Sequence, residues 1–478
     1  MGFSSITFLF YFLPAAILAY FVVPRGSRRI LLLAASYAFY LWGSPIGAAI
    51  LIVSTVLDFI LARAMLAADA GKSRKLLLAS AVSINVAILF YYKYSNFFIG
   101  EFNNALAHFH VTAVPWTAVV FPLGISFITF HKISYLVDIY NGTAPPTRRL
   151  ADYALYLALF PKLLQGPIMR YGPLAKEIAK PESGLGNAFE GAVRFCVGLG
   201  KKVLIADVLG PVVDRIFLLE SQSLTVGYAW IGAIFYTFQI YFDFSGYTDM
   251  AIGIGRILGF SFTENFNRPY ISRNFTEFWR RWHITLGAWF REYLYIPLGG
   301  NRAGAARTYL NLWIVFFVSG LWHGANWTFI VWGLFHGFFM FLDRVFWIEK
   351  SKKLPAALNI VTTFLLLVVG WVFFRSDTIG GAFAYLGRMF EFWNIHAIET
   401  TVLPAQLVGN REAFILVFAA AVSFFPDGWW QALRNAARIR VREWGLTAMK
   451  AFAAFLLLLL SAISLLNNSF SPFIYFRF

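Results

Sequence analysis

Long apolar runs recur along this 478-residue chain and predict a series of membrane-spanning helices. About 20 apolar residues in helical conformation are needed to cross the bilayer core. The runs close to this length are 5–23, 30–46, 48–67, 75–98, 115–139, 308–322, 325–347, 356–374, 413–425 and 446–466. Less regular apolar stretches occupy 150–180, 187–217 and 224–258. We predict an all-α polytopic membrane protein with about 11 to 13 helices across the bilayer, together with re-entrant and interfacial helices.

Basic and non-basic loops alternate between these runs. The basic loops contain Arg25, Arg28 and Arg29; Arg63, Lys72, Arg74 and Lys75; Arg148 and Arg149; Arg344, Lys350, Lys352 and Lys353; and Arg434, Arg438, Arg440 and Arg442. The loop from Glu101 to Pro115 has no lysine or arginine. Because Lys and Arg are enriched in cytoplasmic loops, we expect the basic loops in the cytoplasm and both termini outside. No basic residue precedes the first run, which indicates an uncleaved helix rather than a signal peptide.

The middle of the chain differs from its two ends. From Leu150 to Asn311, polar residues and Gly/Pro breaks interrupt nearly every apolar run. Broken backbone at membrane depth is tolerated only where protein buries it or where it lines a cavity. We therefore predict one integrated membrane domain, with an N-terminal ridge over 1–145, a core around a cavity over 146–347, and C-terminal helices over 348–478. The sequence shows no internal repeat, which argues against most secondary transporters.

Composition excludes a soluble protein. The chain is 59% hydrophobic and only 13% charged, about half the charged fraction of globular domains. Its net charge of +16 is explained by cytoplasmic loop charges, so we expect contact with membrane lipids and not with nucleic acid. A single cysteine, Cys196, excludes an internal disulfide and a cysteine-based metal site. We predict no bound metal.

Two histidines are the first candidates for chemistry. His323 lies between Gly320 and Gly324, a small-residue spacing that allows close helix packing. It is either a general base, since imidazole titrates near neutral pH, or a structural histidine bonded across helices. His283 shares one face with Trp279 and Trp282 if the amphipathic stretch 274–296 is a continuous helix. Arg280 and Arg281 then project elsewhere, toward lipid phosphates or a substrate.

Further polar residues interrupt the apolar middle. Asp243 and Asp249 need partners in an apolar surround, and Arg256, Arg280 and Arg281 are the candidates. These carboxylates either fix helix register or take part in catalysis. Other polar positions are the breaks Asn265, Asn267 and Arg268, the re-entrant turn Pro161–Pro167, and His336, which we expect to pack between Gly333 and Gly337. The sequence has no Walker A, no Gly-x-Ser-x-Gly and no His-Glu-x-x-His motif.

Three of these stretches resemble the signature of a known family. They are Phe-Trp-Arg-Arg-Trp-His-Ile-Thr-Leu at 278–286, Leu-Gly-Gly-Asn-Arg at 298–302, and Gly-Leu-Trp-His-Gly-Ala-Asn at 320–326. The family is that of the membrane-bound O-acyltransferases, and the likeness is nearest to its bacterial alginate O-acetyltransferase (AlgI-like) branch. Residues 243–253, 264–270, 3–5 and 471–478 also fit. The likeness covers nearly the whole chain and implies the family's fold, with helices around a central tunnel.

The resemblance implies O-acetylation of an extracytoplasmic polysaccharide, such as alginate or a related exopolysaccharide. The donor would be a cytosolic thioester, acetyl-CoA, with no permanently bound cofactor. His323 matches the catalytic histidine of the family, and His283 matches a second conserved polar position. An oxyanion would be stabilised by His283, Asn267 or a tryptophan N–H. The expected substrate-binding residues are Asn267, Trp279, Arg280, Arg281, Trp282, Arg302, Asn326, Asp207, Asp243 and Asp249.

The same resemblance implies a location and a partner. We expect a multi-pass protein of the bacterial inner membrane whose acceptor is the polysaccharide or a periplasmic acetyltransferase partner protein. Two alternatives remain at this stage. One keeps the fold but transfers D-alanyl or another acyl group to a cell-wall polymer. The other is a transporter or flippase without covalent chemistry, in which His323 is dispensable for substrate binding.

Overall fold

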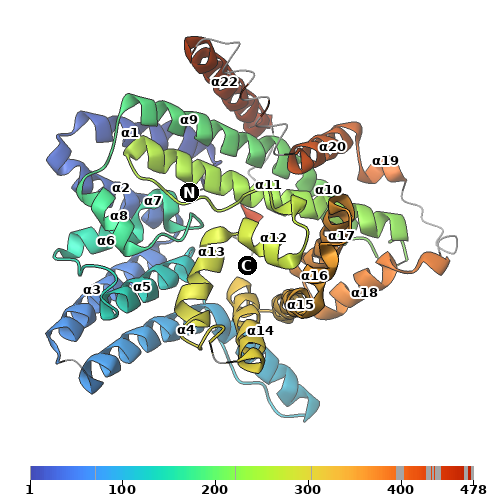
Figure 1. Cartoon of the computed structure of the whole chain (residues 1–478), viewed down its shortest axis with the longest axis horizontal. Helices are drawn as coiled ribbons and strands as arrows, with labels where there is room; N and C mark the ends of the chain where they lie inside the picture. Colours follow the sequence, from blue (N-terminus) through green and yellow to red (C-terminus); the bar gives the residue numbers. More distant parts are fainter. Residues whose placement is uncertain are drawn as a thin grey trace. The chain divides into compact units, whose positions relative to one another are not determined.

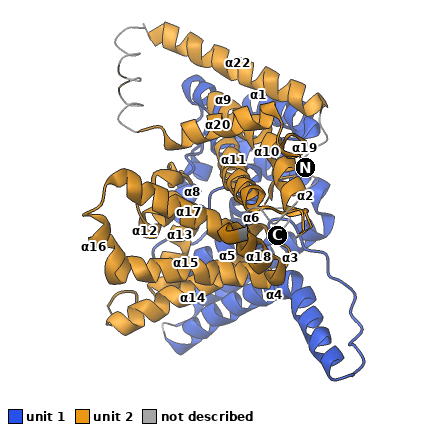
Figure 2. Cartoon of the chain, turned by 90° about the vertical axis from the view of Figure 1, so that its right-hand side faces the viewer, with its two compact units in different colours: residues 1–191, 251–263 blue, residues 192–250, 264–478 orange. Residues whose placement is uncertain are grey.

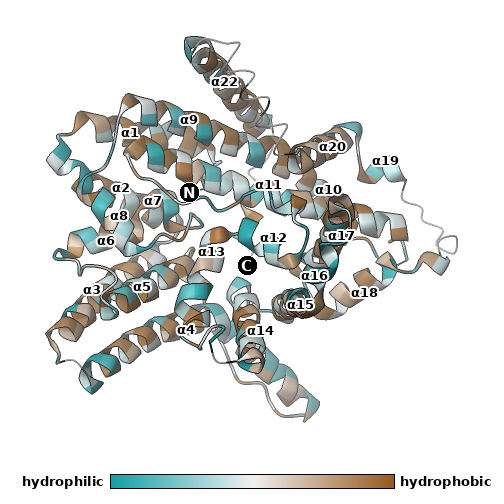
Figure 3. Cartoon of the chain, in the orientation of Figure 1, coloured by the Kyte–Doolittle hydropathy of each residue, from teal (hydrophilic) through white to brown (hydrophobic). Residues whose placement is uncertain are grey.

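The computed structural model is built from helices joined by short connections (Figure 1). It describes residues 2–69, 71–220, 222–302, 304–394, 403–426, 432, 435, 443–467 and 472–474. Within these ranges there is no β-strand. Apolar residues predominate along most of the helices (Figure 3). The all-α prediction is confirmed.

The chain divides into two compact units, which are coloured separately in Figure 2. Unit 1 comprises Met1–Gly191 and Ala251–Thr263, and unit 2 comprises Ala192–Met250 and Glu264–Phe478. These boundaries come from contacts and differ from the sequence-based divisions at 145 and 347, which stay a prediction.

Unit 1 contains the N-terminal helices. These are η1 (Phe8–Phe12), α1 (Leu13–Val22), η2 (Arg25–Ser27), α2 (Arg28–Gly43), α3 (Pro45–Ala67), α4 (Lys72–His108), α5 (Ile125–Tyr140), α6 (Leu150–Ala158), α7 (Phe160–Leu163) and α8 (Tyr171–Ala179), with the start of α9 (Leu185–Gly200). The predicted span 115–139 is wrong in its first half, because α5 begins only at Ile125. Asn96 of α4 bonds the backbone N–H and C=O of Val119 at 2.9 and 2.8 Å. These bonds satisfy an irregular segment that contains Pro115 and Pro122, which lack the N–H of a helix.

Unit 2 contains the helices that position the candidate site. Between α9 and α14 these are η3 (Lys201–Ala206), α10 (Asp207–Phe217), α11 (Val226–Leu258), η4 (Pro269–Ile271), α12 (Phe275–Arg281), α13 (Ile284–Phe290) and η5 (Arg291–Tyr295). The end of α11, from Ala251, belongs to unit 1. From α14 onward these are α14 (Ala305–His323), α15 (Trp327–Leu342), η6 (Asp343–Trp347), α16 (Ile348–Ser351), α17 (Ala356–Arg375), α18 (Ile379–Met389), η7 (Phe392–Asn394), α19 (Pro404–Leu407), α20 (Asn410–Phe424) and α22 (Glu443–Asn467). The stretch 224–258, which the sequence predicted to be irregular, is the single helix α11. The predicted breaks are instead found on either side of it, between α6, α7 and α8 and again between Leu258 and α12.

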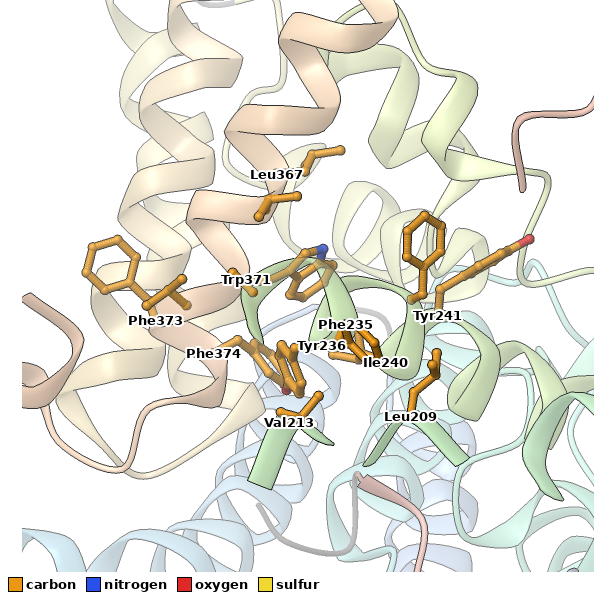
Figure 4. Close-up of a cluster of buried hydrophobic side chains, with 14 of the residues drawn as sticks. Leu209, Val213, Phe235, Tyr236, Ile240, Tyr241, Leu367, Trp371, Phe373 and Phe374 are labelled. Atoms are coloured by element: carbon orange, nitrogen blue, oxygen red, sulfur yellow. The ribbon is translucent and has the colours of Figure 1, made fainter. Parts of the chain in front are cut away.

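The core of unit 2 is aromatic. Side chains of α10, α11 and α17 form part of it, as Figure 4 shows for Leu209, Tyr236 and Trp371 among others. Trp282 and Trp332 are also fully buried in this core. Large rings bury much apolar area with few rotamers to fix, so they hold the short helices around residue 280 in place.

Five helices among the described residues are long and apolar enough to cross a membrane. They are Pro45–Ala67, Lys72–His108, Trp327–Ser351, Ala356–Arg375 and Glu443–Asn467. The chain is therefore a multi-pass membrane protein. The number of 11 to 13 spans and the sidedness of the loops stay predictions, and most of the basic loop 434–442 lies outside the described residues.

Candidate active site

His323 ends helix α14 in the interior of unit 2. Its side chain is 3% exposed. Its Nδ1 lies 2.7 Å from the carbonyl oxygen of Ser319. A carbonyl only accepts, so Nδ1–H donates and the lone pair of the neutral ring is on Nε2. This is the tautomer that a general base acting through Nε2 requires.

Glycines bring α14 and α15 together beside this histidine. A Cβ atom on Gly320 would lie 2.4 Å from the carbonyl oxygen of Phe329, and one on Gly333 would lie 2.3 Å from that of Phe316. No side chain fits at either position, which confirms the close helix packing expected from the small-residue spacing. Asn326 caps α15 by accepting from the Thr328 N–H at 3.0 Å. Its predicted role in binding substrate is not tested by this contact.

Histidines and tryptophans alternate through this interior. The ring of Trp322 lies 6.3 Å from that of His283 and 5.0 Å from that of His323. The ring of Trp332 lies 4.7 Å from those of both His323 and His336. We call these five residues the His/Trp row. The sequence predicted two of its histidines as chemical candidates and expected the third, His336, to pack.

His283 lies at a break between two short helices, so the stretch 274–296 is not the continuous helix on which three side chains would share one face. Helix α12 ends at Arg281, and His283 has the left-handed angle φ 45°. Backbone pairing causes the break: Asn267 N–H donates to Arg281 at 2.9 Å and Ile284 N–H to Asn265 at 3.0 Å. Trp279, Trp282 and His283 therefore do not share a helical face.

Asn265 holds His283 in this strained conformation. Its buried Oδ1 accepts from the Thr285 hydroxyl at 2.9 Å and from His283 Nδ1 at 3.3 Å. A left-handed backbone costs about 1–3 kcal/mol for such residues and persists only where surrounding contacts fix it. His283 lies outside the candidate spans, and burial together with the neighbouring His323 lowers its pKa well below the usual value. The imidazole of His283 is therefore neutral at physiological pH.

A cavity of about 430 Å³ lies beside the row, within unit 2. Trp279, Phe316 and Ser319 line it, and Ser319 is the residue whose carbonyl holds His323. Its walls are mostly apolar side chains from α12, α13, α14 and α15. The volume is in the range of small-molecule sites.

Four exposed arginines line this cavity and a second one of about 560 Å³. Arg280 lines the first, Arg302 the second, and Arg291, Tyr295 and Arg344 line both. None of these arginines forms an ion pair within the described part of the chain. The shared residues make the two cavities neighbours with a cationic, anion-attracting border.

The cationic border is presented by unusual helical segments. Arg291 and Tyr295 belong to the π-helix η5, and Arg344 belongs to the π-helix η6. Short π segments in helices often occur at functional sites. Asp343, 3% exposed, accepts from the N–H and hydroxyl of Thr276 at 2.7 and 2.8 Å, and so ties the start of α12 to η6. Sequence reasoning did not select Arg291, Tyr295 or Asp343, and named Arg344 only as a loop charge.

Three predicted binding residues near α12 have other partners. Arg281 pairs with Glu277 at 2.8 Å. Trp282 packs in the core, with its ring 4.9 Å from that of Trp371. Asn267 is exposed and lines neither cavity. Of the predicted set, only Trp279, Arg280 and Arg302 line the cavities described above.

The predicted aspartates lie in an ion-pair network, and their expected arginine partners were wrong. Lys202 Nζ lies 2.6 Å from Asp243 and 2.7 Å from Asp207. Asp249 pairs with Lys201 at 2.7 Å and with Arg194 at 2.5 Å. These partners come from α9 and η3, which lie next to α11 in space but some 40 to 55 residues away in the sequence. Neither a role in catalysis nor a purely structural role is decided by these contacts.

The chain is similar to several known proteins. The sequence profile of the MBOAT, membrane-bound O-acyltransferase family, matches residues 144–374. The chain is 39% identical to the probable alginate O-acetylase AlgI of Azotobacter vinelandii, over 100% of both chains. It is 32% identical to the peptidoglycan O-acetyltransferase of Helicobacter pylori, over 100% of this chain and 97% of that one. It is 29% identical to the teichoic acid D-alanyltransferase of Bacillus subtilis, over 52% of this chain and 66% of that one.

Proposed function

The chain belongs to the membrane-bound O-acyltransferase family, and we propose that it transfers acetyl from acetyl-CoA for O-acetylation of an extracytoplasmic polysaccharide such as alginate. The protein is an acyltransferase, and its full-length relatives are named for O-acetyl transfer to alginate or peptidoglycan. The observation that carries the proposal is His323, whose tautomer and position beside the 430 Å³ cavity suit a general base.

The cationic border of the two cavities, called the arginine border below, supports a phosphorylated donor. Arg280, Arg291, Arg302 and Arg344 make no ion pair among the described residues. Guanidinium groups bind phosphate oxygens through several N–H donors at once. The phosphates of acetyl-CoA would bind at this border, and its pantetheine arm would follow the apolar cavity toward Ser319 and His323.

The transfer balances with His323 as the only proton carrier. Its Nε2 takes the proton of the acceptor hydroxyl as that oxygen attacks the thioester carbonyl carbon. The C–O bond forms, the carbonyl electrons move onto oxygen, and the tetrahedral intermediate then loses the thiolate as the C–S bond breaks. The imidazolium returns its proton to the leaving sulfur, which gives CoA and the acetyl ester.

We place the two substrates on opposite sides of the membrane. The protein is a multi-pass membrane protein, and we place it in the bacterial inner membrane with its N-terminus outside. The arginine border would then face the cytoplasm, where acetyl-CoA is found. The acceptor would come from the other side, either as the polysaccharide itself or as a hydroxyl on a periplasmic partner protein.

Two alternatives have less support. D-alanyl transfer rests on the 29% identity to a teichoic acid D-alanyltransferase over about half of this chain, whereas the O-acetylase relatives match its full length. A transporter or flippase would need no base at His323.

The test uses the purified full chain in lipid nanodiscs with acetyl-labelled acetyl-CoA and an oligouronate acceptor. Wild type should release CoA and label the acceptor, and His323→Ala should abolish both at unchanged melting temperature. Equal turnover by the two proteins would refute the general base. A wild-type protein that neither turns over nor binds acetyl-CoA would refute the donor.

A further inference from the structure

Three side chains near the cavity have buried polar atoms without hydrogen-bond partners. Among the described residues, the indole N–H groups of Trp279 and Trp332 have no acceptor, and neither ring nitrogen of His336 has a partner. Trp332 and His336 are fully buried. Buried polar groups are almost always paired, because an orphaned one costs about 1–3 kcal/mol. Three such groups in contact with one another therefore need an explanation.

These three side chains lie together beside the proposed base. The ring of Trp332 is 4.7 Å from that of His323 and 4.7 Å from that of His336. The ring of Trp279 is 5.1 Å from His336 and 5.8 Å from Trp332. Trp279 also lines the 430 Å³ cavity. The orphaned donors thus extend from the cavity wall to His323.

Aromatic rings surround His336. The ring of His336 packs against Phe275 at 5.4 Å and Phe278 at 6.2 Å. Phe335 adds a third ring at 5.6 Å. In such an apolar setting a hydrogen bond to a charged oxygen is far stronger than in water. Each indole N–H is a donor only, and neutral imidazole has one N–H donor and one acceptor nitrogen. The three side chains therefore offer three donors against one acceptor, and a ligand that pairs with the excess donors must be an acceptor.

We propose that the indole N–H groups of Trp279 and Trp332, with the imidazole of His336 between them, bind the thioester carbonyl oxygen and stabilise its oxyanion. This rests on the proposed acetyl transfer. The oxygen gains the carbonyl electron pair when the acceptor hydroxyl attacks and gives it back when the C–S bond breaks. Donors fixed by rigid rings before the reaction pay no reorganisation cost as this charge develops.

The other candidates for this role are otherwise engaged. His283 Nδ1 is held by Asn265 at 3.3 Å. Asn267 is exposed, and its backbone N–H donates to Arg281 at 2.9 Å. The geometry therefore favours the tryptophan donors among those that the sequence suggested.

The decisive experiment removes one N–H without changing ring size. Trp279 and Trp332 are replaced separately by 3-benzothienylalanine, in which sulfur takes the place of the indole N–H, in the full chain in nanodiscs. Each loss should lower kcat by about 10²–10³-fold, as for other oxyanion donors, while the dissociation constant for CoA, which lacks the acyl carbonyl, stays within about twofold. Trp230 is the matched control, since its N–H is already satisfied by Met389 at 2.8 Å, and its replacement should leave kcat within about twofold.

A second readout does not need turnover. In the His323→Ala background, the infrared band of ¹³C-carbonyl acetyl-CoA should move to higher wavenumber when either benzothienyl residue is present, because a hydrogen bond to the carbonyl is lost. Unchanged kcat with an unchanged band would overturn the inference. So would a fall in kcat matched by equal losses of CoA affinity and melting temperature, since that indicates a structural role.

The two proposals fail in different ways. If wild type transfers acetyl and His323→Ala does not, while the tryptophan isosteres match wild type, only the oxyanion assignment is wrong. If wild type transfers nothing but the carbonyl band shifts as expected, the donor site is right and the acceptor is wrong. An unshifted band in an inactive protein refutes both.

Discussion

Replacing Gly333 with alanine should separate α14 from α15 and displace His323. The new methyl would lie 2.3 Å from the carbonyl oxygen of Phe316, and contacts below 3.0 Å are essentially never made by Cβ atoms. The helices must therefore move apart by at least about 0.7 Å, the difference between these two distances. The clash is with backbone, so a side-chain rotation cannot relieve it.

The displacement predicts a loss of rate larger than the loss of stability. A misplacement near 1 Å in a catalytic group can cost about 10²-fold in rate, whereas overpacking typically costs about 1–3 kcal/mol of stability. Acetyl transfer by Gly333→Ala should fall on the order of 10²-fold, measured as CoA release in nanodiscs below the melting temperature. The matched control is Gly387→Ala in α18, where a Cβ would meet nothing within 4 Å. Wild-type rates for Gly333→Ala, within about twofold, would refute the reasoning.

Three further predictions concern the supports of the site. Asp343→Asn weakens two charge-assisted bonds to Thr276, each worth about 1.5–3 kcal/mol. It should therefore raise KM for acetyl-CoA more than it lowers kcat, and an unchanged KM would exclude a role of Asp343 in anchoring α12. Lys202→Met leaves the carboxylate of Asp243, 2% exposed, with the Ile474 N–H but without its ion-pair partner. The change should cost about 3–5 kcal/mol, seen as a large fall in melting temperature that Lys202→Arg largely avoids. Burial lowers the pKa of His283, so the unfolded chain binds a proton at this histidine before the folded protein does as the pH falls. The wild type should therefore lose up to about 1.4 kcal/mol of folding stability per pH unit below about pH 6.5 from this group. His283→Asn should flatten the fall in melting temperature between pH 6.5 and pH 5.

The lengths of the hydrophobic runs predicted much of the fold. Helices α2, α3, α14, α15 and α17 lie close to their predicted spans, because length and apolarity are local properties of the chain. The span over 115–139 failed for a non-local reason. In its first half the backbone of Val119 bonds to Asn96 of α4 rather than within a helix, and no periodicity within the segment carries that information.

The sequence predicted several residues of the site but not their geometry. His323, His283, Trp279 and Arg280 were selected from their setting in the sequence. The helix assumed to carry three of them is broken at Trp282 by pairing with residues 265–267, across some 15 residues of chain. The partners of Asp243 and Asp249 were misassigned for the same reason, because a helix-to-helix contact between α9, η3 and α11 is not encoded in local spacing.

The sequence by itself determined that this protein lies in a membrane, since so apolar a chain would not be soluble in water. It also determined the residue types available for acyl transfer. Only the tertiary structure decided which atoms meet. The tautomer of His323, the arginine border and the orphaned N–H groups of Trp279 and Trp332 arise where α12, α14 and α15 pack. Burial and hydrogen-bond satisfaction are properties of that packing and not of any segment alone.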